Sequence, residues 1–177
     1  MSDRERLRSA PWPSSWTVRQ ARDAYLAENG FTVEAYDAKW TDGSFLGIPL
    51  KVPNTRKHRW AIMRHDLHHV ATGYGTDMIG EAEISAWELR AARQLGPYVS
   101  TIVLFGALLG AMRAPLRTIA AFRSGKHARF LYRGEDSDAA YEAMLDLTVG
   151  QLRALLGVPP DGVAEVPRAL HTYAPAG

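Results

Sequence analysis

Glycine, proline and capping residues divide the chain into segments whose lengths suit helices. Polar residues that can cap a helix, such as Thr55 and Ser137, stand where segments begin, and Gly73 and Gly157 stand where segments end. No segment shows the alternation of apolar and polar residues that is typical of a strand. We therefore expect helices over residues 17–28, 31–39, 54–72, 77–95, 98–112, 115–122 and 137–156, with a short strand or helix at 130–132.

This pattern predicts an all-α fold, in the form of a single-domain multi-helix bundle over residues 1–177. A chain of 177 residues is the size of one domain, and we place its core at about residues 17–157. Residues 1–16 are expected to form an irregular lead-in, and residues 158–177, which hold four prolines, an extended tail. Glycines and prolines also predict irregular structure over residues 40–53.

The longest uncharged stretch, from Gly96 to Met112, is too short to cross a membrane. It has 17 residues and is interrupted by glycine and proline, whereas a spanning helix needs about 20 apolar residues. Residues 1–10 mix arginines with Asp3 and Glu5 and have no apolar segment behind them, which does not suit a secretory signal. We expect a cytoplasmic protein, with peripheral attachment to the inner face of the membrane as an alternative.

The composition limits what the chain can bind and how it could hold a metal ion. It has no cysteine, which excludes disulfides, thiolate nucleophiles, iron–sulfur clusters and thiolate zinc sites. Its 21 basic and 19 acidic residues give a net charge of +2, too balanced for a protein whose partner is nucleic acid. Any metal must therefore be bound by histidine nitrogen or carboxylate oxygen.

One short segment, which reads HDLHH, brings potential metal ligands together. On a helix, His65 and His69 lie about 40° apart on one face, and Asp66 falls within the same sector of about 100°. His68 lies about 100° from His69 and points elsewhere. His58 lies about 10.5 Å from His65 along the helix axis, too far for both to bind one metal ion. The spacing therefore predicts His65, Asp66 and His69 as ligands.

Two glutamates of the following helix can add to this set. Glu81 lies in the first turn of that helix, and the glycines of the link allow the helix to fold back toward the histidines. Two imidazoles with one or two carboxylates, and open positions, suit Zn²⁺, with Fe²⁺ or Mn²⁺ as alternatives. Glu88 follows seven residues later on nearly the same face, so it is a candidate to support a ligand or to face the substrate.

Several other metal-site patterns do not fit. The segment is not H-E-x-x-H, because Asp66 stands where those proteases carry glutamate, and no Glu-x-x-His of the ferritin type occurs. The HD phosphohydrolases share the His-Asp doublet but need an earlier histidine on a separate helix, whereas His58 lies on the same helix. A pair of helical histidines that binds no metal is the structural alternative.

The spacing of the histidines, Asp66 and Glu81 resembles the signature of the coenzyme Q (ubiquinone) biosynthesis protein 4 family. Further segments that resemble the family are TDMIG at 76–80, WE at 87–88, GALLGAM at 106–112, SGKHA at 124–128 and LRALLG at 152–157. The resemblance covers roughly residues 54–158. Upstream of the histidines the chain has no match to the family's Tyr-Arg pair, and His68 stands where the family is usually apolar.

The resemblance implies a helical protein with a divalent metal, usually zinc, that acts in ubiquinone biosynthesis on polyprenylated benzoate rings. The positions that match the family's metal ligands are His65, Asp66, His69 and Glu81. It also implies peripheral association with the membrane and with other quinone-biosynthesis proteins. We therefore predict a lyase that carries out metal-assisted C1 decarboxylation of a polyprenylated hydroxybenzoate, with Glu88 or His68 as the residue that shuttles protons.

The non-catalytic alternative is a protein that binds a prenyl lipid or acts as a scaffold that presents intermediates to other enzymes. Gly106 and Gly110 form a G-x-x-x-G spacing, which either leaves a smooth groove for an isoprenoid chain or permits close helix packing. Basic residues before the histidines, such as Arg56 and Lys57, either hold an anionic head group or form a solvated face. The expected partners are a prenylated aromatic or isoprenoid lipid, the membrane surface, other quinone-biosynthesis proteins and a second copy of the chain.

Overall fold

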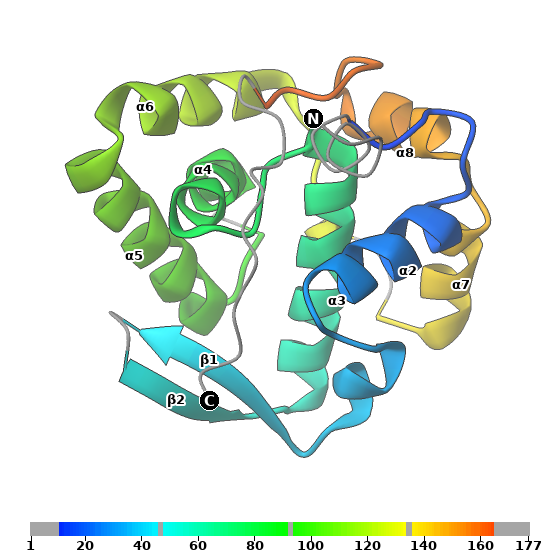
Figure 1. The fold of residues 1–177 in the computed structure, drawn as a ribbon, viewed down its shortest axis with the longest axis horizontal. Helices are drawn as coiled ribbons and strands as arrows, with labels where there is room; N and C mark the ends of the chain where they lie inside the picture. Colours follow the sequence, from blue (N-terminus) through cyan, green and yellow to red (C-terminus); the bar gives the residue numbers. More distant parts are fainter. Residues whose placement is uncertain (1–10, 46–47, 92–93, 134–135, 165–177) are drawn as a thin grey trace.

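The computed structural model describes residues 11–45, 48–91, 94–133 and 136–164 (Figure 1). Its α-helices are α2 (Val18–Glu28), α3 (Arg56–Thr72), α4 (Met78–Glu88), α5 (Pro97–Arg113), α6 (Pro115–Ser124), α7 (Asp138–Leu145) and α8 (Val149–Leu156). The shorter elements are the 3-10 helices η1 (Val33–Asp37), η2 (Leu89–Ala91), η3 (Gly125–His127) and η4 (Leu131–Arg133), and the strands β1 (Trp40–Phe45) and β2 (Ile48–Pro53). The predicted all-α fold class is confirmed for the described residues.

Helix α3 lies in the middle of the molecule between two groups of helices (Figure 1). On one side α4, α5 and α6 pack against one another, and on the other side α2 packs against both α7 and α8. Helix α3 contacts α4 in the first group and α2 and α8 in the second. The segment that carries the predicted histidines therefore lies at the centre of the fold, next to the helix that carries Glu81.

Residues 40–45 and 48–53 form two paired antiparallel strands rather than the irregular structure expected from the sequence. Strand β1 pairs with β2 from Trp40 opposite Pro53 to Phe45 opposite Ile48. The expectation is wrong because both strands of a two-stranded hairpin are edge strands. At an edge, the missing N–H of proline can face away from the partner strand without the loss of a ladder hydrogen bond.

Three of the predicted helices are shorter than expected. The helix predicted over 31–39 is the 3-10 helix η1, which has 5 residues. The helix predicted over 77–95 ends as an α-helix at Glu88 and continues as the 3-10 helix η2. The helix predicted over 137–156 is divided into α7 and α8, because Thr148 begins a new helix. Its side chain accepts a hydrogen bond from the Gln151 N–H, and the Gln151 side chain accepts one from the Thr148 N–H. This capping box is visible in the sequence and could have located the division.

The buried Arg153 ties segments from both ends of the described chain to α3. Its guanidinium donates hydrogen bonds to three carbonyl oxygens, those of Ala71, Trp12 and Pro160. Trp12 is itself buried, so the described part of the predicted lead-in is anchored to the core. Residues 158–164 follow α8 and pack against the end of α3, whereas residues 165–177 lie outside the described residues.

Helix α5 covers the uncharged stretch of the sequence and begins with Pro97 in its first turn, where proline needs no hydrogen-bond partner. It has 17 residues. Within the described ranges, no helix combines the length and the apolar character that a membrane crossing requires.

Candidate metal centre

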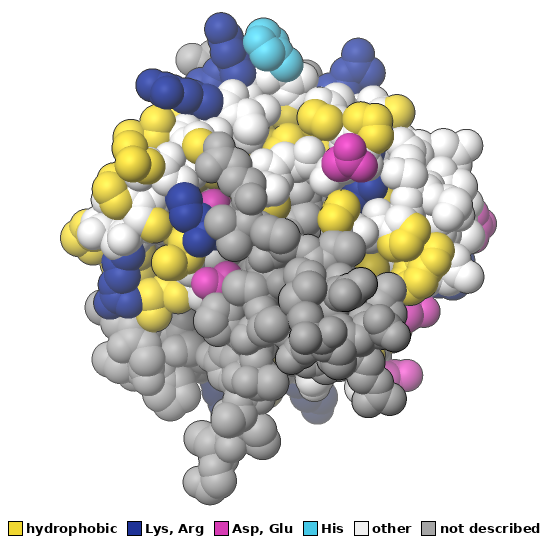
Figure 2. All heavy atoms as spheres, turned by 45° about the horizontal axis from the view of Figure 1, so that its top comes forward, with side chains coloured by type: hydrophobic (Ala, Val, Ile, Leu, Met, Phe, Trp, Pro, Cys, Tyr) yellow, Lys and Arg dark blue, Asp and Glu magenta, His cyan; other side chains and the backbone are white. Residues whose placement is uncertain are grey.

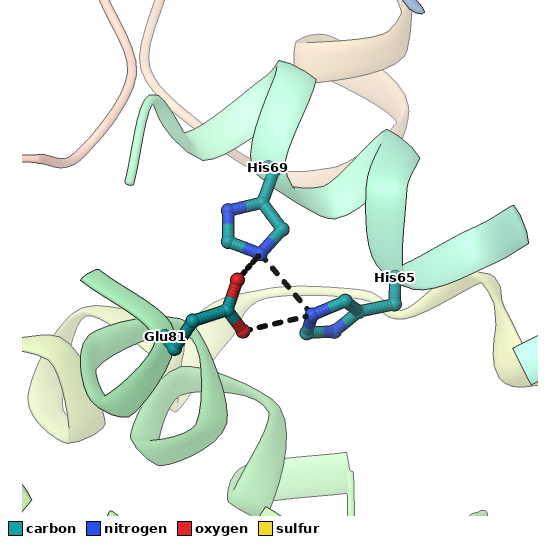
Figure 3. A group of neighbouring side chains, drawn as sticks. All are labelled: His65, His69 and Glu81. Atoms are coloured by element: carbon teal, nitrogen blue, oxygen red, sulfur yellow. Dashed lines mark hydrogen bonds and ion pairs between the residues drawn. The ribbon is translucent and has the colours of Figure 1, made fainter. Parts of the chain in front are cut away.

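A tight turn between α3 and α4 brings the predicted ligands together. Helix α3 ends at Gly73, whose φ of 83° lies in the left-handed region that favours glycine. Asp77 then begins α4, because its side chain accepts a hydrogen bond from the Gly80 N–H. A Cβ atom at Gly80 would collide with the carbonyl group of Gly75, so this turn requires glycine. The turn places Glu81, in the first turn of α4, opposite the histidines of α3 (Figure 3).

Three side chains converge between α3 and α4, and we call them the candidate metal centre (Figure 3). The Nε2 atoms of His65 and His69 are 3.1 Å apart, and each lies 3.4 Å from a carboxylate oxygen of Glu81. The side chain of His69 is buried, whereas that of His65 is 27% exposed and that of Glu81 is 45% exposed. The centre is therefore open to solvent on the side formed by His65 and Glu81.

The second nitrogen of each histidine determines where its lone pair points. Nδ1 of His69 lies 3.0 Å from the carbonyl oxygen of Tyr74, which can only accept a hydrogen bond. Nδ1 of His65 lies 3.0 and 3.1 Å from the two carboxylate oxygens of Glu88, which is also an acceptor. Both rings therefore carry a hydrogen on Nδ1, and both Nε2 lone pairs face each other and Glu81. Such a set of acceptors is repulsive without a positive charge between them, so it fits a metal ion or a bound proton.

Glu88 lies behind the centre and is fully buried. In addition to its contact with His65, its Oε1 accepts hydrogen bonds from Nδ1 of His68 at 2.7 Å and from the hydroxyl of Tyr132 at 2.7 Å. Burial opposes ionisation of this carboxyl group, but the charges and hydrogen bonds of His65 and His68 outweigh it and lower the pKa of Glu88 below its usual value. The sequence predicts two roles for Glu88, support of a ligand or contact with the substrate. Its hydrogen bond with His65 matches the first of these roles.

His68 points away from the centre, as its angle on the helix predicts. It is fully buried, and its ring contacts the rings of Trp87, Phe130 and Tyr132. Its Nε2 accepts a hydrogen bond from the Leu131 N–H at 3.2 Å, and burial lowers the pKa of the imidazole. His68 therefore links Glu88 to the start of η4. A role of Glu88 or His68 in proton transfer stays a prediction.

Asp66, which the sequence predicts as a third ligand from α3, is not part of the group that the structure brings together. Its Oδ2 accepts a hydrogen bond from the hydroxyl of Tyr36 at 2.5 Å, in a buried position. Burial raises the pKa of this carboxyl group above its usual value. Asp66 follows His65 directly, and the rotation of about 100° between them turns its side chain toward η1 instead of α4.

Four tyrosines that surround these groups have no signal in the sequence. The ring of Tyr25 stacks on that of His69, with 5.5 Å between ring centroids. Tyr36 and Tyr132 donate hydrogen bonds to carboxylates, and Tyr74 provides a backbone carbonyl. Tyr25, Tyr36 and Tyr132 come from α2, η1 and η4, so no local spacing connects them to the histidines, whereas Tyr74 follows His69 by five residues in the link between α3 and α4. Their roles follow from the tertiary fold.

Gly106 and Gly110 lie at the contact between α5 and α4. A Cβ atom at Gly106 would lie 2.5 Å from the Ser85 hydroxyl, and one at Gly110 would lie 2.5 Å from the Cβ of Ala82. The absence of these side chains lets the two helices approach closely, as the packing alternative predicts. A contribution of either glycine to lipid binding stays a prediction.

The structure thus shows a helical protein with a candidate metal centre formed by His65, His69 and Glu81. The resemblance to the coenzyme Q biosynthesis protein 4 family stays a prediction from the motif. Comparisons of the chain with protein-family models, with curated proteins and with solved structures find no match.

Proposed function

We propose that this protein is a metal-dependent enzyme of ubiquinone-type (prenylated quinone) biosynthesis, which removes the C1 carboxylate of a polyprenylated hydroxybenzoate. The observation that carries the proposal is the convergence of two imidazole Nε2 atoms and one carboxylate, with separations of 3.1 and 3.4 Å, in a partly open centre. Nitrogen and oxygen donors favour zinc, with iron or manganese as alternatives. The substrate class rests on the resemblance of the histidine motif and Glu81 to the family named above.

The number and exposure of the ligands support a catalytic role over a purely structural one. Structural zinc sites are usually closed by four protein ligands, whereas catalytic sites keep a position for water or substrate. Here His65, His69 and Glu81 provide three side chains, and two of them are partly exposed. Asp66 lies next to them on α3 but is held by Tyr36. Substrate could therefore approach from the side of His65 and Glu81.

The proposed reaction replaces the C1 carboxylate with a proton. The bond between C1 and the carboxylate breaks, CO₂ leaves, and a proton takes its place at C1, so no oxidant is needed. A divalent metal at this centre would supply positive charge that stabilises the negative charge developing on the ring. His65, His69 and Glu81 would hold it. Glu88 keeps the ring of His65 in place and, as a buried anion on its Nδ1, makes its Nε2 a stronger donor.

Metal binding is the first test. Protein treated with a chelator and then titrated with Zn²⁺ should take up one equivalent, measured by calorimetry and elemental analysis. The His69→Ala variant should bind zinc about 100-fold more weakly because a buried ligand is lost. The exposed His127 provides a matched control, since His127→Ala should leave the affinity unchanged. A wild-type protein that takes up no divalent ion would refute the proposal.

Turnover is the second test. Protein loaded with zinc, iron or manganese should release CO₂ from a carboxyl-labelled polyprenylated hydroxybenzoate. Chelation should abolish this release and leave the helical circular dichroism intact, because the helices around the centre are packed by a large apolar core. Loaded protein that retains a prenyl lipid through purification but releases no CO₂ would instead support the non-catalytic lipid carrier or scaffold.

A further inference from the structure

The outward faces of α5 and α6 carry large apolar side chains that the fold leaves exposed. The most exposed are Leu116 at 82%, Met112 at 72% and Leu108 at 53%. Further exposed apolar side chains on these two helices are Ile102, Leu104, Phe105, Ile119 and Phe122. We call this set the α5–α6 surface. Soluble proteins rarely leave so many neighbouring large apolar groups in water, and such surfaces usually mark a contact with a partner or a membrane.

The apolar residues of α5 lie on two opposite sides of the helix. Val103 and Ala107 are buried, on the side where α5 packs against α4. Leu104, Leu108 and Met112 recur every four residues and form a stripe on the other side. Since the first side already satisfies the packing of α5, the second is not needed for the core. Helix α6 packs against both α4 and α5 and extends the exposed stripe.

The charged residues of the segment that carries this surface are all basic. No aspartate or glutamate lies between Glu88 and Glu135 in the sequence, a stretch that includes α5 and α6 entirely. Within it, Arg113, Arg123 and Lys126 are exposed. Figure 2 shows hydrophobic side chains interspersed with Lys and Arg side chains on the left of the molecule, the side on which α5 and α6 lie in Figure 1. An apolar stripe bordered by basic residues is complementary to an anionic lipid surface.

A second copy of the chain fits this surface less well. A symmetric dimer places the same patch of both subunits face to face. Arg113 and Arg123 would then face a copy of the same patch, and the segment between Glu88 and Glu135 offers no acidic residue to pair with them. The charge pattern therefore favours an anionic surface over self-association.

Two of the basic residues of α3 form ion pairs within the protein. Arg59 forms ion pairs with Asp37 at 3.0 Å and with Asp138 at 3.2 Å. Arg64 pairs with Asp136, also within the chain, at 2.5 Å. These intramolecular pairs make α3 a weaker candidate for contact with lipid head groups.

We propose that the α5–α6 surface docks on the surface of an anionic phospholipid bilayer, with both helices lying along the membrane interface. The apolar side chains would enter the boundary between head groups and acyl chains, and the basic ones would pair with phosphates. Helix α4, on which both α5 and α6 pack, carries Glu81, so docking would hold the candidate metal centre one helix away from the bilayer. The docking itself does not depend on the proposed function of that centre.

Vesicle flotation with the full-length chain tests the proposal. Vesicles of phosphatidylcholine alone are compared with vesicles in which about one third of the lipid is phosphatidylglycerol. We expect binding at least about tenfold tighter to the anionic vesicles, weakened by added salt. A wild-type chain that binds neither kind of vesicle would overturn the proposal.

Matched variants assign the binding to the surface. Leu108→Ser combined with Leu116→Ser should weaken binding to anionic vesicles about tenfold or more, because two side chains no longer enter the interface. Leu155→Ser is the control, since Leu155 is 46% exposed but lies on α8. For charge, Arg123→Glu should weaken binding, whereas Lys57→Glu on α3 should have a much smaller effect. Circular dichroism and zinc content should be unchanged in all four.

Two further outcomes separate the explanations. Vesicle binding should persist in the His69→Ala variant, so failure of the metal centre and failure of the docking surface are distinguishable. If the Leu108→Ser, Leu116→Ser variant binds vesicles as well as the wild type, the proposal is wrong. A wild-type dimer in sedimentation experiments that dissociates in the same variant would assign the surface to a second copy and would equally overturn it.

Discussion

The two groups of helices on either side of α3 differ in what they present to solvent. Between α2 and α7 the surface is polar, and Arg19 forms ion pairs with Glu142 at 2.8 Å and with Asp146 at 3.0 Å. On α5 and α6 the surface is apolar, and Leu116 is almost entirely exposed. Both groups nevertheless bury apolar side chains toward the core, such as Leu145 of α7. The exposed leucines of α5 and α6 are therefore not explained by folding and indicate a function.

Helix α4 separates two departures from the usual rule that polar groups lie outside and apolar groups inside. On its side facing α3 it buries the carboxylate of Glu88, and on its other side it packs against α5 and α6. A buried carboxylate is tolerated only when its hydrogen bonds are made, and Glu88 has partners in His65, His68 and Tyr132. Sites where a chain departs from such rules are often functional.

The largest effect should come from removing this buried carboxylate. Glu88→Ala leaves His65 and His68 without their acceptor and should lower the free energy of unfolding by about 3–5 kcal/mol. The surface pair on the other side of the molecule provides the comparison, because Glu142→Ala should cost less than about 1 kcal/mol. Urea unfolding followed by circular dichroism measures both. Equal losses in the two variants would mean that the buried network contributes no more than a surface ion pair.

A slightly smaller effect should distinguish the inner and outer leucines. Leu145 is fully buried, and Leu145→Ala should lower the free energy of unfolding by about 2–5 kcal/mol. Leu116→Ala removes the same atoms from an exposed site and should change it by less than about 0.5 kcal/mol. Thermal or urea unfolding of the two variants checks this. A large loss in Leu116→Ala would show that another part of the chain covers α6 in solution.

The contrast between local and distant contacts also explains what could be predicted from the sequence. His65 and His69 are four residues apart on one helix, so their convergence follows from helix geometry alone. Glu81 follows from the glycines that end α3 and from the capping residue Asp77. Asp66 shows the limit of this reasoning, because a shared sector on a helix does not decide whether a side chain turns toward α4 or toward η1.

Tertiary contacts account for most of what the sequence could not predict. Tyr36 and Tyr132 reach their carboxylates from elements far along the chain, and no spacing in the sequence relates them to the histidines. The exposure of one side of α5 is similar, since α5 carries apolar residues on both sides and no polar face marks the exposed one. The second side would be buried only if another element of the fold packed on it. The spacing of apolar residues along α5 does not tell whether such an element is present, and the described residues leave this side exposed.

A third prediction concerns the two sides of α5. Alanine at Gly110 would meet Ala82 and Thr118 at 2.5 and 2.7 Å, so Gly110→Ala should destabilise the protein by about 1–3 kcal/mol despite the higher helix propensity of alanine. Ala111 is the exposed neighbour, and Ala111→Gly should cost about 1 kcal/mol through propensity alone. Urea unfolding compares the two. Stabilisation by Gly110→Ala would contradict the close contact between α5 and α4.

The smallest predicted effect is a difference in pH response between the metal centre and the α5–α6 surface. Burial opposes protonation of His65, but the charges of Glu88 and Glu81 outweigh it and raise the pKa of His65 well above its usual value. A metal ion must displace that proton, so zinc affinity should fall about tenfold, or about 1.4 kcal/mol, for each pH unit below this pKa.

Docking depends on apolar and arginine side chains, residue types that do not titrate between about pH 5 and 8. Zinc affinity, measured against a competing chelator, should therefore fall with pH while vesicle binding stays constant. Both measurements use the His127→Ala variant, which lacks the histidine of η3, directly after α6. A parallel loss of zinc and vesicle binding would mean that the two regions are coupled through α4.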